Sequence, residues 1–347
     1  MTTPLGEAIA SLVRDEGPID LARFMALALG HPVHGYYRTR DPLGAAGDFT
    51  TAPEISQMFG ELVGLWAAHA WQRLGRPDPV LLAELGPGRG TLMADALRAV
   101  ARAAPDFLRA ARLHLVETSP VLRQRQADAL AGHAPAWHEA TDTLPDGPLI
   151  LIANEFFDAL PVRQFQRRDG RWHERLVGLA GDRLAFGLAA GPAGIDGLPE
   201  APDGAILELG EAGLRLAGHL AARLARDGGA ALILDYGHIE TGFGDTLQAM
   251  RRHAGADPLA EPGEADLTTH VDFAALAAAA AAAGARIDLM AGQADFLEGL
   301  GIRERAAALK RRATPAQVAD IDAALARLTD RGRTGMGALF KVLALSG

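Results

Sequence analysis

Short apolar runs alternate with helix-like segments through the middle of the chain. The runs cover residues 80–85, 113–116, 149–153 and 230–234, and none of them alternates with polar residues. Unalternated runs of this length between helices are typical of parallel strands that are buried on both faces of a sheet. The pattern therefore predicts a doubly wound α/β fold, with helices at about 91–103 and 120–131 between the strands.

The segments before and after these runs have other patterns. Residues 1–38 have helical spacing, with Asp20 as the N-cap of a helix over 19–29, and a further helix is expected at about 55–74. Residues 162–190 alternate as antiparallel strands do, with turn signals at Asp169-Gly170 and Gly181-Asp182. One more strand is expected at 337–345.

These patterns suggest two domains. Residues 1–75 form an N-terminal helical extension and a loop. Residues 76–347 form the sheet domain, with an inserted β-hairpin or helical subdomain at about 162–204 and C-terminal helices at about 301–331.

Composition and charge exclude several classes of protein. The chain has 347 residues and no Cys, so disulfides, a thiolate nucleophile and Cys-ligated zinc are excluded. The formal net charge of -9 argues against a nucleic-acid partner. The start of the chain has no basic segment followed by an apolar core, and no stretch matches the roughly 20 apolar residues of a membrane span. The expectation is a cytoplasmic protein without a membrane span, whose oligomeric state is open.

Every apolar run ends in a polar residue or a glycine. In open α/β sheets, ligands bind beyond the carboxyl ends of the strands, so these ends form the candidate site. The histidines show no zinc-binding spacing, and no metal is expected.

A glycine-rich turn follows the first run, in Glu84-Leu85-Gly86-Pro87-Gly88-Arg89-Gly90-Thr91. Such a turn lets a ligand approach the backbone and directs the N–H groups of a helix N-terminus toward it. Thr91 stands where the dinucleotide fingerprint has its third small residue. Glu84 would repel a pyrophosphate but suits an ammonium group. The turn therefore favours S-adenosylmethionine over NAD, and the alternative is a tight structural turn.

Two further segments carry acids. Glu117 ends the second run, where a carboxylate can accept both ribose hydroxyls of a nucleoside cofactor; the alternative is a solvated acid at a strand end. Glu155 and Asp158 follow the third run and alternate with Phe156 and Phe157. Aromatic rings can wall a pocket in which carboxylates bind a guanidinium. The alternative is a helix N-terminus with favourable acids.

The chain resembles the MidA family of S-adenosylmethionine-dependent methyltransferases over nearly its whole length. The blocks that carry the resemblance are GDFTTAPEISQMFGEL (47–62), ELGPGRGTLMADALR (84–98), VETSPVLRQRQ (116–126), ANEFFDALPVRQF (153–165), ILDYGH (233–238), GDTLQAMRRH (244–253), ADLTTHVDF (265–273) and MGALFKVLAL (336–345).

The resemblance implies a Rossmann-like methyltransferase fold with S-adenosyl-L-methionine as cofactor. It also implies that residues 47–57 cover the cofactor. The expected cofactor contacts are Asp48, Thr50, Glu84, Gly86, Gly88, Gly90, Glu117 and Asn154.

The resemblance also bears on the methyl acceptor. Mitochondrial members of the family are assembly factors for respiratory complex I that dimethylate an arginine of a core subunit. The implied activity is protein-arginine methylation of such a subunit or of an analogous protein. Glu155 would grip the acceptor, and Asp158 would be a second acid. The alternatives are a small-molecule methyltransferase on the same fold and an assembly chaperone that binds the cofactor without catalysis.

Overall fold

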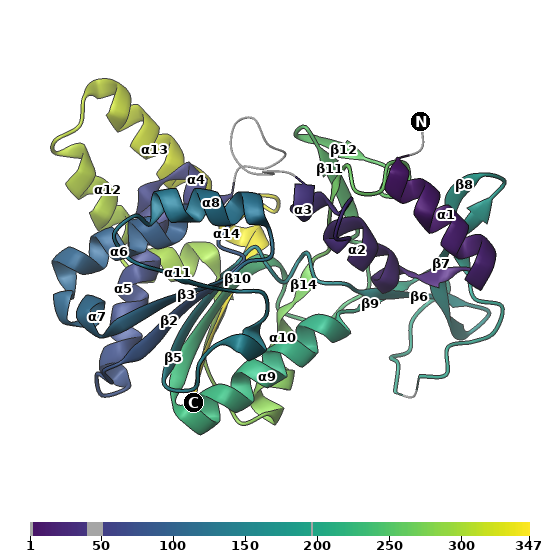
Figure 1. The fold of residues 1–347 in the computed structure, drawn as a ribbon, viewed down its shortest axis with the longest axis horizontal. Coiled ribbons are helices and arrows are strands. Elements are labelled where there is room, and N and C mark those ends of the chain that lie inside the picture. The colour runs from purple at the N-terminus through teal and green to yellow at the C-terminus, as the bar shows by residue number, and fades with distance from the viewer. Residues whose placement is uncertain (1–2, 40–50, 196) are drawn as a thin grey trace.

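A twisted, mainly parallel sheet forms the centre of the computed structural model, which describes residues 3–39, 51–195 and 197–347 (Figure 1). In spatial order its strands are β15 (Arg286–Gly292), β16 (Phe340–Ser346), β10 (Gly229–His238), β5 (Leu149–Asn154), β2 (Val80–Leu85), β3 (Ala111–Val116) and β4 (Ala136–His138), with β14 (Val271–Asp272) beside the end of β10. Strands β4, β3, β2, β5 and β10 run parallel, whereas β16 lies antiparallel between β10 and β15.

The four apolar runs are the four central strands, so the prediction of a doubly wound sheet is confirmed. After β2 the chain moves outward through β3 and β4, then returns to β5 on the other side of β2. The connections from β2 and β5 therefore leave in opposite directions. This reversal opens a crevice at the carboxyl ends of the two strands.

Helices cover both faces of this sheet. On one face α5 (Gln57–Arg73) and α6 (Thr91–Ala103) pack against even-numbered residues of β2, such as Val80 and Leu82. On the other face α9 (Glu211–Asp227) and α10 (Phe273–Ala282) pack against the odd-numbered residues Leu81, Ala83 and Leu85. The alternation follows from the two-residue period of a strand.

The remaining helices lie around the sheet. They are α4 (Ala52–Ile55), α7 (Pro105–Ala110), α8 (Pro120–Ala129), the 3₁₀ helix η1 (Thr141–Thr143), α11 (Gln293–Gly299), α12 (Ile302–Lys310), α13 (Pro315–Thr329) and α14 (Met336–Leu339). Helices α6, α8, α12 and α13 lie where the sequence pattern predicted them.

A second unit stands beside the central sheet, on the right of Figure 1. It joins the N-terminal helices to the inserted strands, and we call it the antiparallel unit. Its elements are α1 (Pro4–Glu16), β1 (Ile19–Asp20), α2 (Leu21–Gly30), α3 (Tyr36–Thr39), β6 (Arg163–Arg168), β7 (Arg171–Ala180), β8 (Arg183–Leu188) and β9 (Ile206–Leu209). Strand β1 pairs with β7, so residues distant in sequence share one sheet and one apolar core.

The N-terminal segment and the insertion differ in part from expectation. Asp20 caps α2 as predicted, and its Oδ1 accepts from Arg23 N at 2.7 Å, but Ile19 belongs to a strand because β7 supplies a partner. The insertion is a sheet that reaches Leu209, larger than the predicted hairpin.

Other strands were not expected, or begin elsewhere. A small ribbon of β11 (Gln248–Arg251), β12 (Ala254–Ala256) and β13 (Asp266–Thr268) was not expected, and neither were β4 and β15. The last strand begins at Phe340, because the residues before it form α14.

The expected domain boundary at residue 75 stays a prediction. Helix α5 precedes that boundary yet packs on the central sheet. Over the residues that the structure describes, no helix combines the length and apolar character needed to cross a membrane.

Replacing Phe24 by Ala should destabilise the antiparallel unit. Phe24 is fully buried in the core that α1 and α2 share with β7. Truncating a buried Phe costs about 3–5 kcal/mol of unfolding free energy. Urea denaturation measures this loss. The control is Val33→Ala, which changes a side chain that is 64% exposed, and we expect it to stay within about 0.5 kcal/mol of wild type. Equal effects of the two substitutions would contradict the prediction.

Candidate functional site

A cavity of about 430 Å³ lies at the carboxyl ends of the central strands. The antiparallel unit, the strand ends and the ribbon all contribute to its lining. The lining residues include Gly30, Tyr37 and Arg38 of the antiparallel unit, Gly86, Gly88, Glu117, Thr118, Glu139, Glu155, Phe156, Asp158 and Tyr236 after the strands, and Asp266 and Thr268 of the ribbon. The site therefore forms only where these parts of the chain meet.

The glycine-rich turn brings backbone to the cavity wall. Gly86 and Gly88 line the cavity and have φ angles of 58° and 55°. A side chain on Gly86 would come within 2.9 Å of Cδ2 of Phe156. The turn thus needs glycine for its left-handed backbone and for the close contact with the next strand end.

Three predicted contact residues lie behind the lining. Gly90 is the N-cap of α6, and Asn154 is buried at the end of β5, where its Nδ2 donates to Glu155 Oε1 at 3.2 Å. Glu84 is 2% exposed, lies within β2 and does not line the cavity. Burial raises its pKa to about 8. Contact between these residues and a cofactor stays a prediction.

Glu117 lines the cavity and is only 8% exposed, so the alternative of a solvated acid is wrong. Its Oε1 accepts from Ser119 N at 2.7 Å, and its Oε2 accepts from Gln126 Nε2 at 3.1 Å. The same Gln126 amide donates to Gly88 O at 2.8 Å. Gln126 therefore ties the acid to the glycine-rich turn and orients its carboxylate.

The segment after β5 is a tight turn whose backbone N–H groups donate to Asp235 of β10. Asp235 Oδ2 accepts from three successive backbone N–H groups, those of Phe156, Phe157 and Asp158, at 3.0–3.2 Å. Glu155 has a left-handed φ of 51°. No helix begins at this turn, so the alternative of a helix N-terminus is wrong. The N–H groups that a helix would leave unpaired are satisfied by a buried carboxylate.

Glu155 forms part of the cavity wall and is half-buried. Its Oε1 accepts from Ala52 N and from Asn154 Nδ2, each at 3.2 Å. Burial, with a smaller contribution from the charge of Asp158, raises the pKa of Glu155 to about 7. The carboxyl group can therefore hold or release a proton near neutral pH.

Asp158 lies deeper and is 5% exposed. The Tyr236 hydroxyl donates to its Oδ2 at 2.6 Å, while its Oδ1 has no hydrogen-bond partner in the part of the chain that the structure describes. Burial raises the pKa of Asp158 to about 6, and the bond from Tyr236 opposes that rise. The structure thus brings Glu155 and Asp158 into one cavity, as the sequence predicted.

Asp48 and Thr50 lie outside the described residues, as do all of residues 47–50 of the 47–57 segment expected to cover the cofactor. The described end of that segment reaches the site. Thr51 lines the cavity, and the backbone N–H of Ala52 donates to Glu155.

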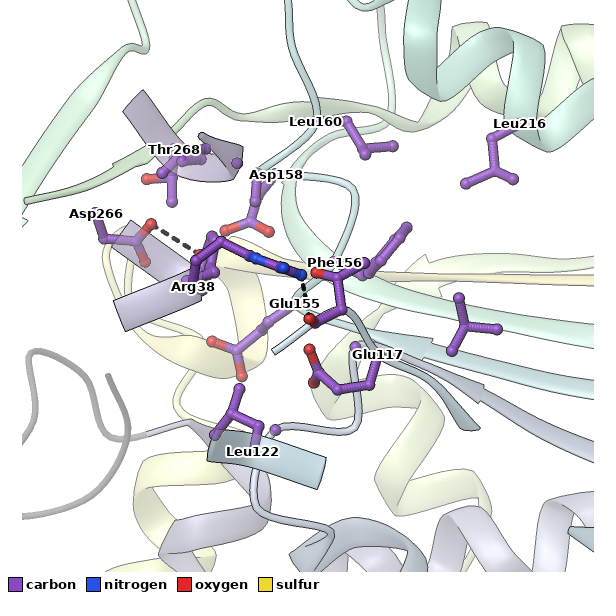
Figure 2. A pocket seen from close by; sticks show the side chains of 18 of the residues that line it. Arg38, Glu117, Leu122, Glu155, Phe156, Asp158, Leu160, Leu216, Asp266 and Thr268 are labelled. Carbon is purple, nitrogen blue, oxygen red and sulfur yellow. Dashed lines mark hydrogen bonds between the residues drawn. The ribbon is translucent and has the colours of Figure 1, made fainter. Parts of the chain in front are cut away.

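Several lining residues were not predicted from sequence. Figure 2 shows the side chains of Arg38 and Asp266 in the cavity with Glu155 and Asp158. The Tyr37 hydroxyl donates to Asp266 Oδ1 at 2.8 Å, and Arg38 donates to Thr118 O. Asp266 and Tyr236 lie in the sequence blocks 265–273 and 233–238, which were the signal that could have identified them.

The cavity has two chemically distinct ends. We call the region of Gly86, Gly88 and Glu117 the cofactor end, because the sequence predicts cofactor contacts at these residues. We call the region of Asp158 and Asp266 the acceptor end, because buried carboxylates there suit a cation. Across the described ranges, no group of three or more His, Cys, Asp or Glu side chains is arranged to hold a metal ion.

The sequence is similar to a family of methyltransferases and to named members of it. Residues 62–290 match the family model described as "Putative S-adenosyl-L-methionine-dependent methyltransferase". A Drosophila melanogaster protein named "Protein arginine methyltransferase NDUFAF7 homolog, mitochondrial" is 39% identical over 303 residues, which cover 78% of this chain and 68% of that protein. The Homo sapiens protein named "Protein arginine methyltransferase NDUFAF7, mitochondrial" is 36% identical over 340 residues, which cover 87% and 74%.

A solved structure is similar over almost the whole chain. It is that of a superfamily member from Burkholderia thailandensis, described as a candidate methyl transferase and bound to S-adenosyl-homocysteine. It superposes with a TM-score of 0.83 at 28% identity, covering 99% of this chain and 92% of that one.

The relatives correct one expectation. Their names place them in mitochondria, which contradicts the cytoplasmic location expected from sequence. That expectation rested on missing targeting and membrane signals, and the absence of a signal does not locate a protein.

Replacing Asp235 by Ala should destabilise the turn after β5. The substitution leaves three buried N–H groups without their acceptor, and each unsatisfied group costs about 1–3 kcal/mol. We expect a loss of about 3 kcal/mol or more in unfolding free energy, measured by urea denaturation. Asp235→Asn keeps one acceptor oxygen and should lose less. A fully stable Ala variant would refute this account of the turn.

Glu84→Gln should reduce the pH dependence of stability. The folded carboxyl has a pKa of about 8 against an ordinary 4.5, so the folded state holds a proton that the unfolded chain releases between these values. The unfolding free energy must therefore fall as pH rises through that window. The measurement is the unfolding free energy of the cofactor-free protein at about pH 5 and at about pH 8. Because one pKa unit corresponds to about 1.4 kcal/mol, the difference between these two values should be a few kcal/mol smaller in Glu84→Gln than in wild type.

The matched control for Glu84→Gln is Glu304→Gln, which changes an exposed acid on α12. It should keep the wild-type difference between the two pH values. If Glu84→Gln does the same, burial of Glu84 is not a source of the pH dependence.

Proposed function

Because the chain belongs to the MidA family of S-adenosylmethionine-dependent methyltransferases, we propose that it methylates an arginine side chain of a protein. The observation that carries the proposal is the pair of acids, Glu155 and Asp158, in the same cavity as the glycine-rich turn. The names of the relatives support arginine as the acceptor. The resemblance of the sequence blocks supports a subunit of respiratory complex I, or an analogous protein, as the protein that carries it.

The cofactor end fits S-adenosylmethionine. A volume of about 430 Å³ lies in the range of pockets that hold such ligands. We propose that Glu117 accepts the ribose hydroxyls, since Gln126 and Ser119 N already fix its carboxylate. Gly86 and Gly88 would offer backbone to the methionine part. The product of methyl donation is bound in the related Burkholderia thailandensis structure.

Glu155 and Asp158 would orient the guanidinium and stabilise its charge. When bound, the cofactor supplies a methyl group on a sulfonium, whose sulfur keeps the bonding electron pair as the new N–C bond forms. The reaction releases one proton from the acceptor nitrogen. We assign Glu155 to receive this proton, because its pKa of about 7 lets it change between the ionised and the protonated carboxyl group. Phe156 would help to exclude water from the reacting atoms.

Gly88→Val should abolish cofactor binding. A β-branched side chain at a φ of 55° is strained, and it would occupy the space along the cavity wall. We expect calorimetry to show S-adenosyl-homocysteine binding to wild type, with an affinity about 100-fold lower or more in the variant. NAD should bind wild type far more weakly. The control is Gly255→Val in the ribbon, where no atom lies within 4 Å of an added Cβ. Equal or tighter NAD binding would contradict the cofactor end as described.

Glu155→Gln should slow methylation without weakening cofactor binding. The substitution keeps the shape of the side chain and removes its charge. Loss of one charged contact at a dry reacting centre is worth about 2–4 kcal/mol, or on the order of 10²- to 10³-fold in rate. The measurement is transfer of labelled methyl groups to protein arginine, with the S-adenosylmethionine Kd determined in parallel and expected within a few-fold of wild type. Near-normal turnover would remove Glu155 from its proposed role.

A further inference from the structure

Two carboxylates at the acceptor end are each held by a tyrosine hydroxyl. Tyr236 of β10 donates to Asp158 Oδ2 at 2.6 Å. Tyr37 of α3 donates to Asp266 Oδ1, on β13 of the ribbon, at 2.8 Å. The two pairs thus combine the turn after β5, the central sheet, the antiparallel unit and the ribbon. All four residues line the same cavity.

The two pairs lie close together. Burial raises the pKa of Tyr37 well above its usual value, and the charges of both Asp266 and Asp158 raise it further. The hydroxyl of Tyr37 is therefore within electrostatic reach of both carboxylates. A cation that enters this end of the cavity meets two acids, one from the turn after β5 and one from the ribbon.

Asp158 Oδ1 is a buried acceptor without a donor among the described residues. Asp158 is 5% exposed, and this oxygen has no hydrogen-bond partner among the residues that the structure describes. Burying a carboxylate oxygen without a donor costs free energy. Because Tyr236 holds the other oxygen, Oδ1 is the one that remains for a donor inside the cavity.

A guanidinium suits this subsite better than an ammonium. A guanidinium is planar, carries five N–H donors in a fixed geometry and stacks on aromatic faces. Phe156 and the two tyrosines supply aromatic surface beside the carboxylates. An ammonium is a compact charge with three donors, and it gains less from two separate carboxylates and flat walls.

We propose that Asp158 and Asp266 form the subsite that binds the acceptor guanidinium, with Tyr236 and Tyr37 as positioning residues that orient the two carboxylates. The proposal rests on the proposed function and adds to it a third acid, Asp266, distant from Glu155 and Asp158 in sequence. It also assigns the preference for arginine over lysine to these two pairs.

The test measures guanidinium binding without turnover. The probe is Nα-acetyl-arginine amide, titrated into the full chain saturated with S-adenosyl-homocysteine and followed by saturation-transfer NMR. Nα-acetyl-lysine amide is the comparison. Wild type should bind the arginine probe more tightly than the lysine probe. Asp158→Asn and Asp266→Asn should each weaken arginine binding about 10- to 100-fold, the effect of losing a charged hydrogen bond. Asp266→Asn should also remove most of the preference over lysine.

The tyrosine variants test positioning. Tyr37→Phe and Tyr236→Phe keep the rings and remove only the hydroxyls, and each should weaken arginine binding several-fold. The matched control is Tyr36→Phe, which removes a phenol hydroxyl from the same helix as Tyr37 but outside the cavity lining. It should bind the probe as wild type does. The Kd of S-adenosyl-homocysteine should stay within a few-fold in every variant and reports that the site is folded.

A pH profile separates orientation from packing. The bond from Tyr236 lowers the pKa of Asp158. Loss of that bond in Tyr236→Phe should raise the pKa of Asp158. The pH above which the variant binds the guanidinium probe should therefore be higher than in wild type. The other titratable or charged groups around Asp158 are unchanged in this variant; they are Glu155, Asp235, Asp266, Tyr37 and Arg38. A purely structural role for Tyr236 would leave the pH midpoint where it is.

The outcomes distinguish this inference from the proposed function. Wild-type arginine binding in Asp266→Asn, with the protein folded, overturns the subsite. If that variant does not fold, unchanged binding in Tyr37→Phe overturns it instead. If the arginine probe binds in an Asp266-dependent way while no protein arginine is methylated, the proposed function fails and the subsite stands. If wild type methylates protein arginine and Asp266→Asn leaves the KM for that protein unchanged, the proposed function stands and the subsite fails.

Discussion

One buried carboxylate determines the shape of the site. Asp235 lies within β10 and accepts hydrogen bonds from three successive N–H groups of the turn after β5. A buried backbone donor must find a partner, and the sharp turn leaves no helix or strand to provide one. With these donors satisfied, Glu155 takes its left-handed conformation and lines the cavity with Phe156 and Asp158. The bonds to Asp235 thus fix the backbone from which the side chains of Glu155 and Asp158 extend.

The site keeps several acids where water is scarce. Burial raises the pKa of Asp158 to about 6, that of Glu155 to about 7, and that of Asp235 well above its usual value. Their proximity raises the cost of ionising all of them together. A cation bound in the cavity would lower the cost of ionising these acids.

The cofactor end and the acceptor end have different origins in the chain. The cofactor end comes from consecutive βα units, with Gly86 and Gly88 after β2 and Glu117 after β3. The acceptor end joins α3, the turn after β5, β10 and the ribbon. The cofactor end therefore lies within the βα units of the sheet, whereas the acceptor end also depends on the ribbon and the antiparallel unit. This division agrees with the rule that scaffold ends supply the site and attached segments supply specificity.

The sequence by itself determined the central strands, the glycine-rich turn and the acids Glu117, Glu155 and Asp158, because each is a local signal within one βα unit. It could not determine that Ile19 joins a sheet with β7, that Glu84 does not line the cavity, or that Asp266 lines the same cavity as Asp158. The first depends on a strand partner far along the chain, and the second on which face of β2 the helices cover. The third depends on how the ribbon packs against the sheet, and hence on long-range contacts that no local pattern contains. Only the tertiary structure therefore decided the acceptor end.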